Sequence, residues 1–246
     1  HSAIKDFFDT INTNNIKWAD LDDKKSENII NDSIEKVMEQ YENDALNDIA
    51  RSAFIKKQVK DTSTETVNAL VKHIRSGNFL PREYELRIAH GRVDRVDTFE
   101  DGNNIYVKVI DYKSGNKVFN VTETFLGLQM QLMVYLKDTV DYIKKNNPDK
   151  NVYPAAGLYF HIYDPYVSEI DCEKAVSDFR KNNPDSELSD EELKKMAIEG
   201  ERFKAYRMSG LVAKEIEIVN AMDHNTITKT GSSAILPVNI TKSGVD

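Results

Sequence analysis

Two acidic residues and a lysine, Asp94, Asp111 and Lys113, have types and spacing that could perform chemistry. Apolar-alternating runs flank residues 101–104, Asp-Gly-Asn-Asn, a sequence typical of the turn of a β-hairpin. If this turn is centred on residues 102 and 103, Asp94 lies opposite Asp111 on the neighbouring strand. Directly opposed side chains have Cβ atoms roughly 4.5–5.5 Å apart, where like charges are destabilising. Two such carboxylates need a cation between them, or one must stay protonated.

Lys113 follows Asp111 by two residues, so both side chains project from the same face of the expected strand. Two carboxylates and a lysine on one face predict a site for a divalent metal ion and a phosphodiester. The alternative is a solvated strand surface, because Asp-x-Lys spacing is common by chance. A register shift of one residue would also place Asp94 and Asp111 on opposite faces.

Two further acids on the same strands are expected to lie outside this site. Asp97 is three residues from Asp94 and should therefore face away from it. Glu85 is expected at the surface of an edge strand, with an additional acid at the site as the alternative.

Four motifs, in order over residues 1–160, resemble the RecB branch of the PD-(D/E)xK nucleases. Segments 91–97 (Gly-Arg-Val-Asp-Arg-Val-Asp) and 110–115 (Ile-Asp-Tyr-Lys-Ser-Gly) are similar to its catalytic core. Gln131 and Tyr135 lie four apart, on one helical face, and resemble its Gln-x-x-x-Tyr helix. His1 opens a segment similar to the helix that carries the metal-binding histidine, and residues 154–160 extend the match. Within the branch, the combination most resembles the C-terminal nuclease domains of AddB-type subunits of helicase–nucleases.

The resemblance implies a fold and a metal site. The fold would be an α/β (α+β) restriction-endonuclease-like core, a central mixed sheet flanked by helices. The metal would be Mg²⁺ or Mn²⁺, because carboxylates suit hard cations and an imidazole ligand extends the preference to Mn²⁺. Its ligands would be His1, Asp94, Asp111 and the backbone carbonyl of Tyr112.

The resemblance also implies how the remaining residues act. Lys113 would orient or help deprotonate the attacking water and stabilise the charge of the transition state. Gln131 and Tyr135 would orient the nucleophile or contact phosphate, with helix packing as the alternative. AddB-type domains work on DNA beside an AddA-type helicase–nuclease subunit, as a heterodimer.

Composition limits the other possibilities. The 246 residues, 40% hydrophobic and 30% charged, are typical of a globular protein, and no apolar run reaches the roughly 18 residues that span a bilayer. We therefore expect no membrane association. A single cysteine, Cys172, excludes an internal disulfide and suits the reducing cytoplasm. The net charge of −8 disfavours strong autonomous binding to nucleic acid, so a partner would supply a basic DNA channel.

The organisation is helical at both flanks with a β-rich centre. We expect a single domain over residues 1–246, with a helical part at 1–78, a catalytic core at 80–165 and an insertion or lid at about 170–210. A capping box at Thr62–Glu65 should open one helix, and another at Ser189–Glu192 should open a second. Strands are expected at 84–88, 91–99, 105–112 and 156–163, a helix at 122–145, a last helix at 215–222 and one short strand near the end.

Relatives in the resembled family are typically stapled by an iron–sulfur cluster. With one mid-chain cysteine, we expect no cluster in these residues, which lack an initiating Met and look excised from a longer polypeptide. Three functions compete. The first is an exonuclease domain of an AddAB-type helicase–nuclease that processes double-strand DNA ends for recombinational repair. The second is another RecB-like repair or phage exonuclease. The third is a non-catalytic scaffold for a helicase partner.

Overall fold

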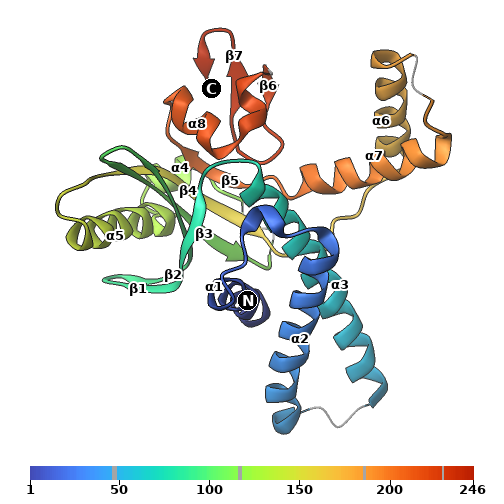
Figure 1. Ribbon diagram of the computed structural model, residues 1–246, viewed down its shortest axis with the longest axis horizontal. Helices are drawn as coiled ribbons and strands as arrows, with labels where there is room; N and C mark the ends of the chain where they lie inside the picture. The colour runs from blue at the N-terminus through green and yellow to red at the C-terminus, as the bar shows by residue number, and fades with distance from the viewer. Residues whose placement is uncertain (46–48, 116–117, 185–186, 229) are drawn as a thin grey trace.

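A five-stranded mixed sheet forms the centre of the molecule. The computed structural model describes residues 1–45, 49–115, 118–184, 187–228 and 230–246. The strand order is β1-β2-β3-β4-β5, and only the β3–β4 pair is parallel. The sheet, with helices on both faces, confirms the predicted fold class (Figure 1). The strands are β1 (Leu80–Ile88), β2 (Gly91–Asp101), β3 (Asn104–Lys113), β4 (Asn151–His161) and β5 (Ser209–Val212).

Three N-terminal helices cover one face of this sheet. They are α1 (Ser2–Thr13), α2 (Asp23–Ala45) and α3 (Ile49–Arg75), with a short 3₁₀ helix, η1 (Trp18–Asp20), between the first two. The apolar side of α1 is fully buried against Ile110, Tyr112 and Phe160 of the sheet and against α3. Each large apolar side chain buried in this way contributes roughly 1.5–3 kcal/mol. This packing fixes the start of α1, and therefore His1, against the central strands.

The expected helix start at Thr62 is wrong, because Thr62 and Glu65 both lie inside α3. A capping box requires non-helical backbone at its first residue. Here the preceding residues are mainly good helix formers, so the helix continues through the motif. Val67, Leu70, Val71 and Ile74, which recur at helical spacing in this segment, are buried.

The other face of the sheet is covered by α5 (Gln131–Asn146). Its apolar side packs on Val96, Val107 and Val109, so odd-numbered residues of β3 face α5 while Ile110 and Tyr112 face α1. The predicted helix at 122–145 is wrong in its first part. A short helix, α4 (Val121–Phe125), is separated from α5 by non-helical residues, and Gly127 has a φ of 79°. A left-handed residue ends a helix, so α5 begins at Gln131 instead.

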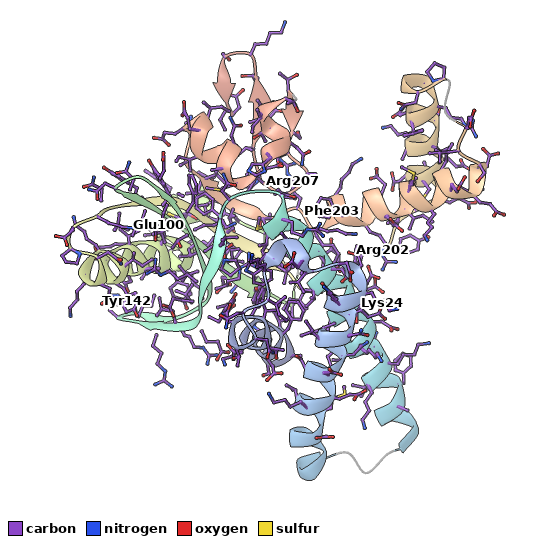
Figure 2. All side chains as sticks on the ribbon, viewed as in Figure 1. Lys24, Glu100, Tyr142, Arg202, Phe203 and Arg207 are labelled. Carbon is purple, nitrogen blue, oxygen red and sulfur yellow. The ribbon has the colours of Figure 1, made fainter. Side chains whose placement is uncertain are left out.

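The segment after β4 forms a helical arm that projects from the body (Figure 1). It consists of α6 (Glu169–Asn182) and α7 (Asp190–Ala205), and the predicted capping box at Ser189 and Glu192 is present. Arg202 and Phe203 lie at the base of the arm (Figure 2). Arg202 pairs with Glu65 of α3 at 3.6 Å, and the Phe203 ring lies 5.1 Å from that of His73. These contacts anchor the arm to the N-terminal helices.

The last residues complete the core beside β5. They form α8 (Ile216–Met222), η2 (His224–Ile227) and a small sheet of β6 (Gly231–Ser232), β7 (Asn239–Thr241) and β8 (Gly244–Val245). One short strand was expected there, and three are present because brief pairings of two or three residues leave little sequence pattern. No helix in the described ranges is both long and apolar enough to cross a membrane.

Candidate active site

The β2–β3 hairpin carries both predicted metal-binding aspartates, Asp94 on β2 and Asp111 on β3. Asp101 pairs with Asn104, as predicted, and the ladder runs back to Arg95 opposite Ile110. The paired ladder ends there, so the opposition of Asp94 and Asp111 stays a prediction. The Asp94 carboxylate accepts a hydrogen bond from the Tyr112 backbone N–H at 2.7 Å. A residue's N–H and C=O point to the same neighbouring strand, so the Tyr112 carbonyl is also directed to the Asp94 side.

Lys113 is held at this site by side chains from two further elements. Its ammonium group pairs with Asp111, donates to Gln131 Oε1 at 3.1 Å and lies 5.1 Å from the centre of the Tyr159 ring. Gln131 in turn donates from Nε2 to the Tyr135 hydroxyl at 3.0 Å. The first turn of α5 therefore reaches over the end of β3. Asp111, Lys113, Gln131 and Tyr135 form one continuous polar chain.

Tyr135 contributes to packing as well as to this chain. Its ring contacts the core between α5 and the sheet, and it abuts Gly91 at the start of β2. A Cβ at Gly91 would lie 3.0 Å from the Tyr135 ring and hydroxyl, and the φ of Gly91 is 149°. Glycine at position 91 thus lets the Gln131–Tyr135 pair approach the hairpin that carries Asp94.

His1 lies beside Asp94. Its Nδ1 is 3.9 Å from Asp94 Oδ2, which is too long for a hydrogen bond. Its ring packs edge-on against that of Tyr112, with centroids 5.9 Å apart. His1, Glu85, Asp94 and Tyr112 line a crevice of about 10 Å³, space for about one water-sized sphere. Two metal–ligand bonds of about 2.1 Å each would span the gap between the imidazole and the carboxylate.

Glu85 lies on the edge strand β1, as predicted, and it also lines this crevice. Tyr84 pairs with Arg95 and Leu86 with Val93, so Glu85 lies opposite Asp94. Its side chain is 28% exposed and pairs with Arg92 at 3.6 Å. Glu85 has a φ of 49°, which turns it out of regular strand alternation. The hairpin of β1 and β2 therefore adds a second carboxylate to the crevice, beside that of Asp94.

Tyr159 is a residue that sequence reasoning did not single out. It is fully buried on β4 and pairs with Asp111 across the parallel ladder. Its ring forms the surface under the Lys113 ammonium group. The parallel β3–β4 pairing places it there, and this long-range pairing has no local sequence signal.

Burial makes the Asp94 carboxyl harder to ionise, and a bound cation would offset this. Burial raises the pKa of Asp94, against the hydrogen bond from Tyr112 and the charges of Lys113 and Arg92. A nearby cation would stabilise the ionised carboxylate. In the part of the chain that the structure describes, no three His, Cys, Asp or Glu side chains are grouped closely enough to hold an ion by themselves. Imidazole and carboxylate donors suit Mg²⁺ or Mn²⁺. The Tyr112 carbonyl and oxygen atoms of solvent or substrate would have to complete the coordination.

Metal binding should therefore be measurable as stabilisation. We expect Mn²⁺ at about 100 times its Kd to raise the free energy of unfolding by about 2.7 kcal/mol, since the ion binds only the folded state. Asp94→Asn should lose this increase because it removes the charged ligand. Asp101→Asn, at the exposed hairpin tip, should keep it. Thermal denaturation with and without Mn²⁺ measures the effect, and an equal shift in all three proteins would contradict the assignment of Asp94.

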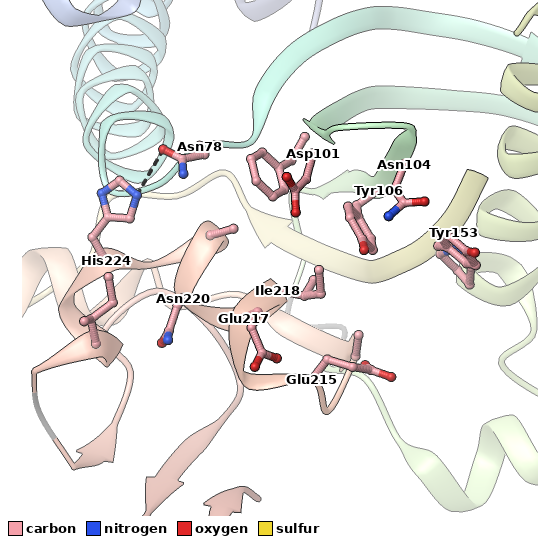
Figure 3. Close-up of a pocket in the computed structure, with 15 residues that line it drawn as sticks. Asn78, Asp101, Asn104, Tyr106, Tyr153, Glu215, Glu217, Ile218, Asn220 and His224 are labelled. Carbon is pink, nitrogen blue, oxygen red and sulfur yellow. Dashed lines mark hydrogen bonds between the residues drawn. The ribbon is translucent and has the colours of Figure 1, made fainter. Parts of the chain in front are cut away.

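A large cavity lies elsewhere in the described residues (Figure 3). It measures about 840 Å³ and lies between the sheet and α8, at the opposite end of β3 from Lys113. Phe99, Tyr106 and Tyr153 stack along one side, and the carboxylates of Glu215 and Glu217 lie on the other. No lysine or arginine is among its described lining residues, so it does not suit a phosphodiester.

A mixed sheet whose central hairpin presents Asp94, Asp111 and Lys113 defines a nuclease fold of the PD-(D/E)XK class. The sequence matches the PD-(D/E)XK nuclease superfamily over residues 1–222, and the chain belongs to this superfamily. It is also similar to a particular group of large proteins, the B-type subunits of ATP-dependent helicase/deoxyribonucleases. Identity is 30% to that of Clostridioides difficile strain 630, 28% to that of Thermoanaerobacter sp. strain X514 and 27% to that of Exiguobacterium sibiricum. These matches cover 99%, 99% and 100% of this chain but 21% of each relative, so the chain spans about a fifth of their length.

Proposed function

We propose that these residues form a Mg²⁺- or Mn²⁺-dependent exodeoxyribonuclease domain. In this proposal the domain works in the cytoplasm within an AddAB-type helicase–nuclease and processes double-strand DNA ends for recombinational repair. The observation that carries the proposal is the polar chain from Asp111 through Lys113 to Gln131, set beside Asp94. A lysine paired with one carboxylate and close to a second has the geometry for hydrolysis of a phosphodiester at a metal ion.

In the proposed mechanism, His1, Asp94, Asp111 and the Tyr112 carbonyl would hold the ion. A bound divalent metal lowers the pKa of water and neutralises charge on the scissile phosphate. Burial and the Tyr112 N–H fix the Asp94 carboxylate in one position, so the ligand is oriented before the ion arrives. Glu85 adds negative charge on the same crevice.

Lys113 acts on the water and on the transition state. Its ammonium group is held by Gln131 and supported by the Tyr159 ring, so it points into the site instead of into solvent. A fixed positive charge next to the reacting phosphate stabilises the negative charge that develops there. Gln131 positions Lys113, and the Tyr135 hydroxyl positions Gln131.

The assembly follows from the relatives. Their name couples a helicase with a deoxyribonuclease, and this supports DNA as substrate and an AddA-type subunit as partner in a heterodimer. The net charge of −8 is compatible with a partner that provides much of the cationic DNA channel. A RecB-like exonuclease of another repair or phage system is the second candidate, since it would use the same residues. The intact polar chain argues against a non-catalytic scaffold.

The test is cleavage of linear and circular single-stranded DNA by the purified protein. After removal of metal with EDTA, we expect no cleavage, and addition of Mg²⁺ or Mn²⁺ should restore shortening of an end-labelled linear strand. Circular DNA should be spared, because an exonuclease needs an end. Equal cleavage of both forms would contradict the exonuclease assignment. No cleavage with either ion would contradict the proposal and favour the scaffold.

A further inference from the structure

A group of apolar side chains is exposed between the two ends of the active site. Residues 118–130 join Lys113 on β3 to Gln131 on α5. Phe125 is 89% exposed and Leu128 is 75% exposed. Four more exposed apolar side chains in the same segment are Val118, Val121, Leu126 and Met130. Contiguous exposed apolar residues mark an interaction site more often than isolated ones do.

The buried side chain of Gln129 holds this segment in a fixed shape. Its Oε1 accepts from the Asn120 N–H at 2.8 Å, and its Nε2 donates to the Val118 carbonyl at 3.2 Å and to Glu123 at 3.3 Å. The Thr124 hydroxyl donates to the Asn120 carbonyl at 2.9 Å. The Gln129 side chain is thus turned inward, while the apolar side chains of the segment are exposed. A surface fixed in this way loses little entropy on binding.

Residues 118–130 carry a single charged side chain, Glu123, so charge raises no strong barrier to a polyanion here. From Lys113 to Gln131 the sequence carries two lysines and one glutamate, whereas the whole chain has a net charge of −8. That glutamate, Glu123, contacts Gln129 inside the segment. A strand whose phosphate lies at Lys113 can therefore pass over residues 118–130 without strong repulsion.

We propose that residues 118–130 form a platform on which the unpaired bases of the substrate strand stack, with Phe125 as its main contact. This inference rests on the proposed nuclease function and adds how the substrate is recognised. Aromatic side chains bind single-stranded nucleic acid by base stacking, which tolerates any sequence. A stretch of unpaired DNA held next to Lys113 suits a nuclease that receives strands from a helicase.

The first experiment separates base contacts from phosphate contacts. Binding of dT20 and of a 20-mer of abasic sites is measured by fluorescence anisotropy in EDTA, which prevents cleavage. The unmodified protein should bind dT20 about 5- to 100-fold more tightly than the abasic strand, since one base–aromatic stack has an effect of this order. In Phe125→Ala this ratio should fall toward one, and Phe125→Tyr should restore it. Tyr166, which is 91% exposed and follows β4 in the chain, provides the control: Tyr166→Ala should keep the full ratio.

The second experiment detects the stack directly. The chain has one tryptophan, Trp18, so Phe125→Trp in a Trp18→Phe background places a single indole on the platform. We expect dT20 to quench its emission and the abasic 20-mer to leave it nearly unchanged. Equal emission with and without dT20 would overturn the proposal and leave these residues as a surface for a protein partner.

The outcomes distinguish this inference from the proposed function. If the unmodified protein cuts DNA and prefers dT20 while Phe125→Ala keeps the same preference, the platform is wrong and the nuclease stands. If the unmodified protein neither binds dT20 nor cuts DNA with metal, the proposed function fails and the platform fails with it.

Discussion

Replacing Lys113 with alanine is expected to lower metal-dependent cleavage of end-labelled single-stranded DNA by about 10²–10³-fold. This is the order of loss found when a fixed group that stabilises transition-state charge is removed. The polar chain consists of Asp111, Lys113, Gln131 and Tyr135. Among these four described residues, Lys113 alone carries a positive charge. Its removal therefore takes a cationic neighbour from Asp111 and a hydrogen-bond donor from Gln131.

The matched control is Lys137→Ala. Lys137 lies nearly two helical turns from the start of α5 and pairs with Asp141 at 2.6 Å on the solvent-exposed side. We expect its loss to leave both cleavage and stability essentially unchanged, because exposed ion pairs contribute little. Cleavage by Lys113→Ala at the rate of the unmodified protein would show a contaminating nuclease or a different site. Far-ultraviolet circular dichroism of both variants verifies that they remain folded.

The hairpin that carries the site was predictable because its rules are local. The turn at 101–104 fixes the register, and the predicted pairing is confirmed from Asp101 opposite Asn104 to Arg95 opposite Ile110. The opposition of Asp94 and Asp111, and the orientation of Asp97 away from Asp94, stay predictions. The position of Lys113 beside Asp111 likewise follows from strand alternation.

The structure departs from what local sequence patterns suggest where contacts between distant residues decide the conformation. Glu85 reaches the crevice because β1 carries a register shift between Pro81 and Glu83 and a positive φ at Glu85. Residues 126–130 leave the expected helix because buried Gln129 hydrogen bonds to the backbone at Val118 and Asn120. Both irregularities lie at the site. Neither is visible in the composition of its segment or in the spacing of its apolar residues, so neither could be predicted from the sequence. Backbone strain and irregular loops are common at functional sites for this reason.

Replacing Asp97 with asparagine is expected to cost about 3–5 kcal/mol of the free energy of unfolding. The Asp97 carboxylate is fully buried and accepts from Arg95 Nε at 2.6 Å and Nη2 at 2.7 Å, while Lys108 Nζ lies 3.0 Å away. Arg95 also donates to the Tyr112 hydroxyl at 3.4 Å. The backbone N–H of the same tyrosine donates to Asp94. Asparagine keeps the shape but leaves two buried cations without a neutralising charge. Urea denaturation at pH 7 measures the loss.

The pH dependence of this loss identifies the carboxylate charge as its cause. Burial opposes ionisation of Asp97, but the charges of Arg95 and Lys108 outweigh burial and hold its pKa below the usual value of 3.8. A lowered folded-state pKa gives stability that is complete above the unfolded-state pKa and disappears as pH falls through the folded-state value. The difference between the unmodified protein and Asp97→Asn should therefore be largest near neutral pH and shrink below about pH 4.

A second substitution tests whether uncompensated charge, and not lost shape, destabilises the variant. Adding Lys108→Met to Asp97→Asn removes one of the two buried cations, so part of the lost stability should return. Asp101→Asn, an exposed aspartate on the same hairpin, should change stability by no more than about 0.5 kcal/mol. If Asp97→Asn costs less than about 1 kcal/mol, or Lys108→Met restores nothing, Asp97 does not hold the two cations in place. In that case the rigidity of the strands behind Asp94 must come from apolar packing of α1 against the sheet.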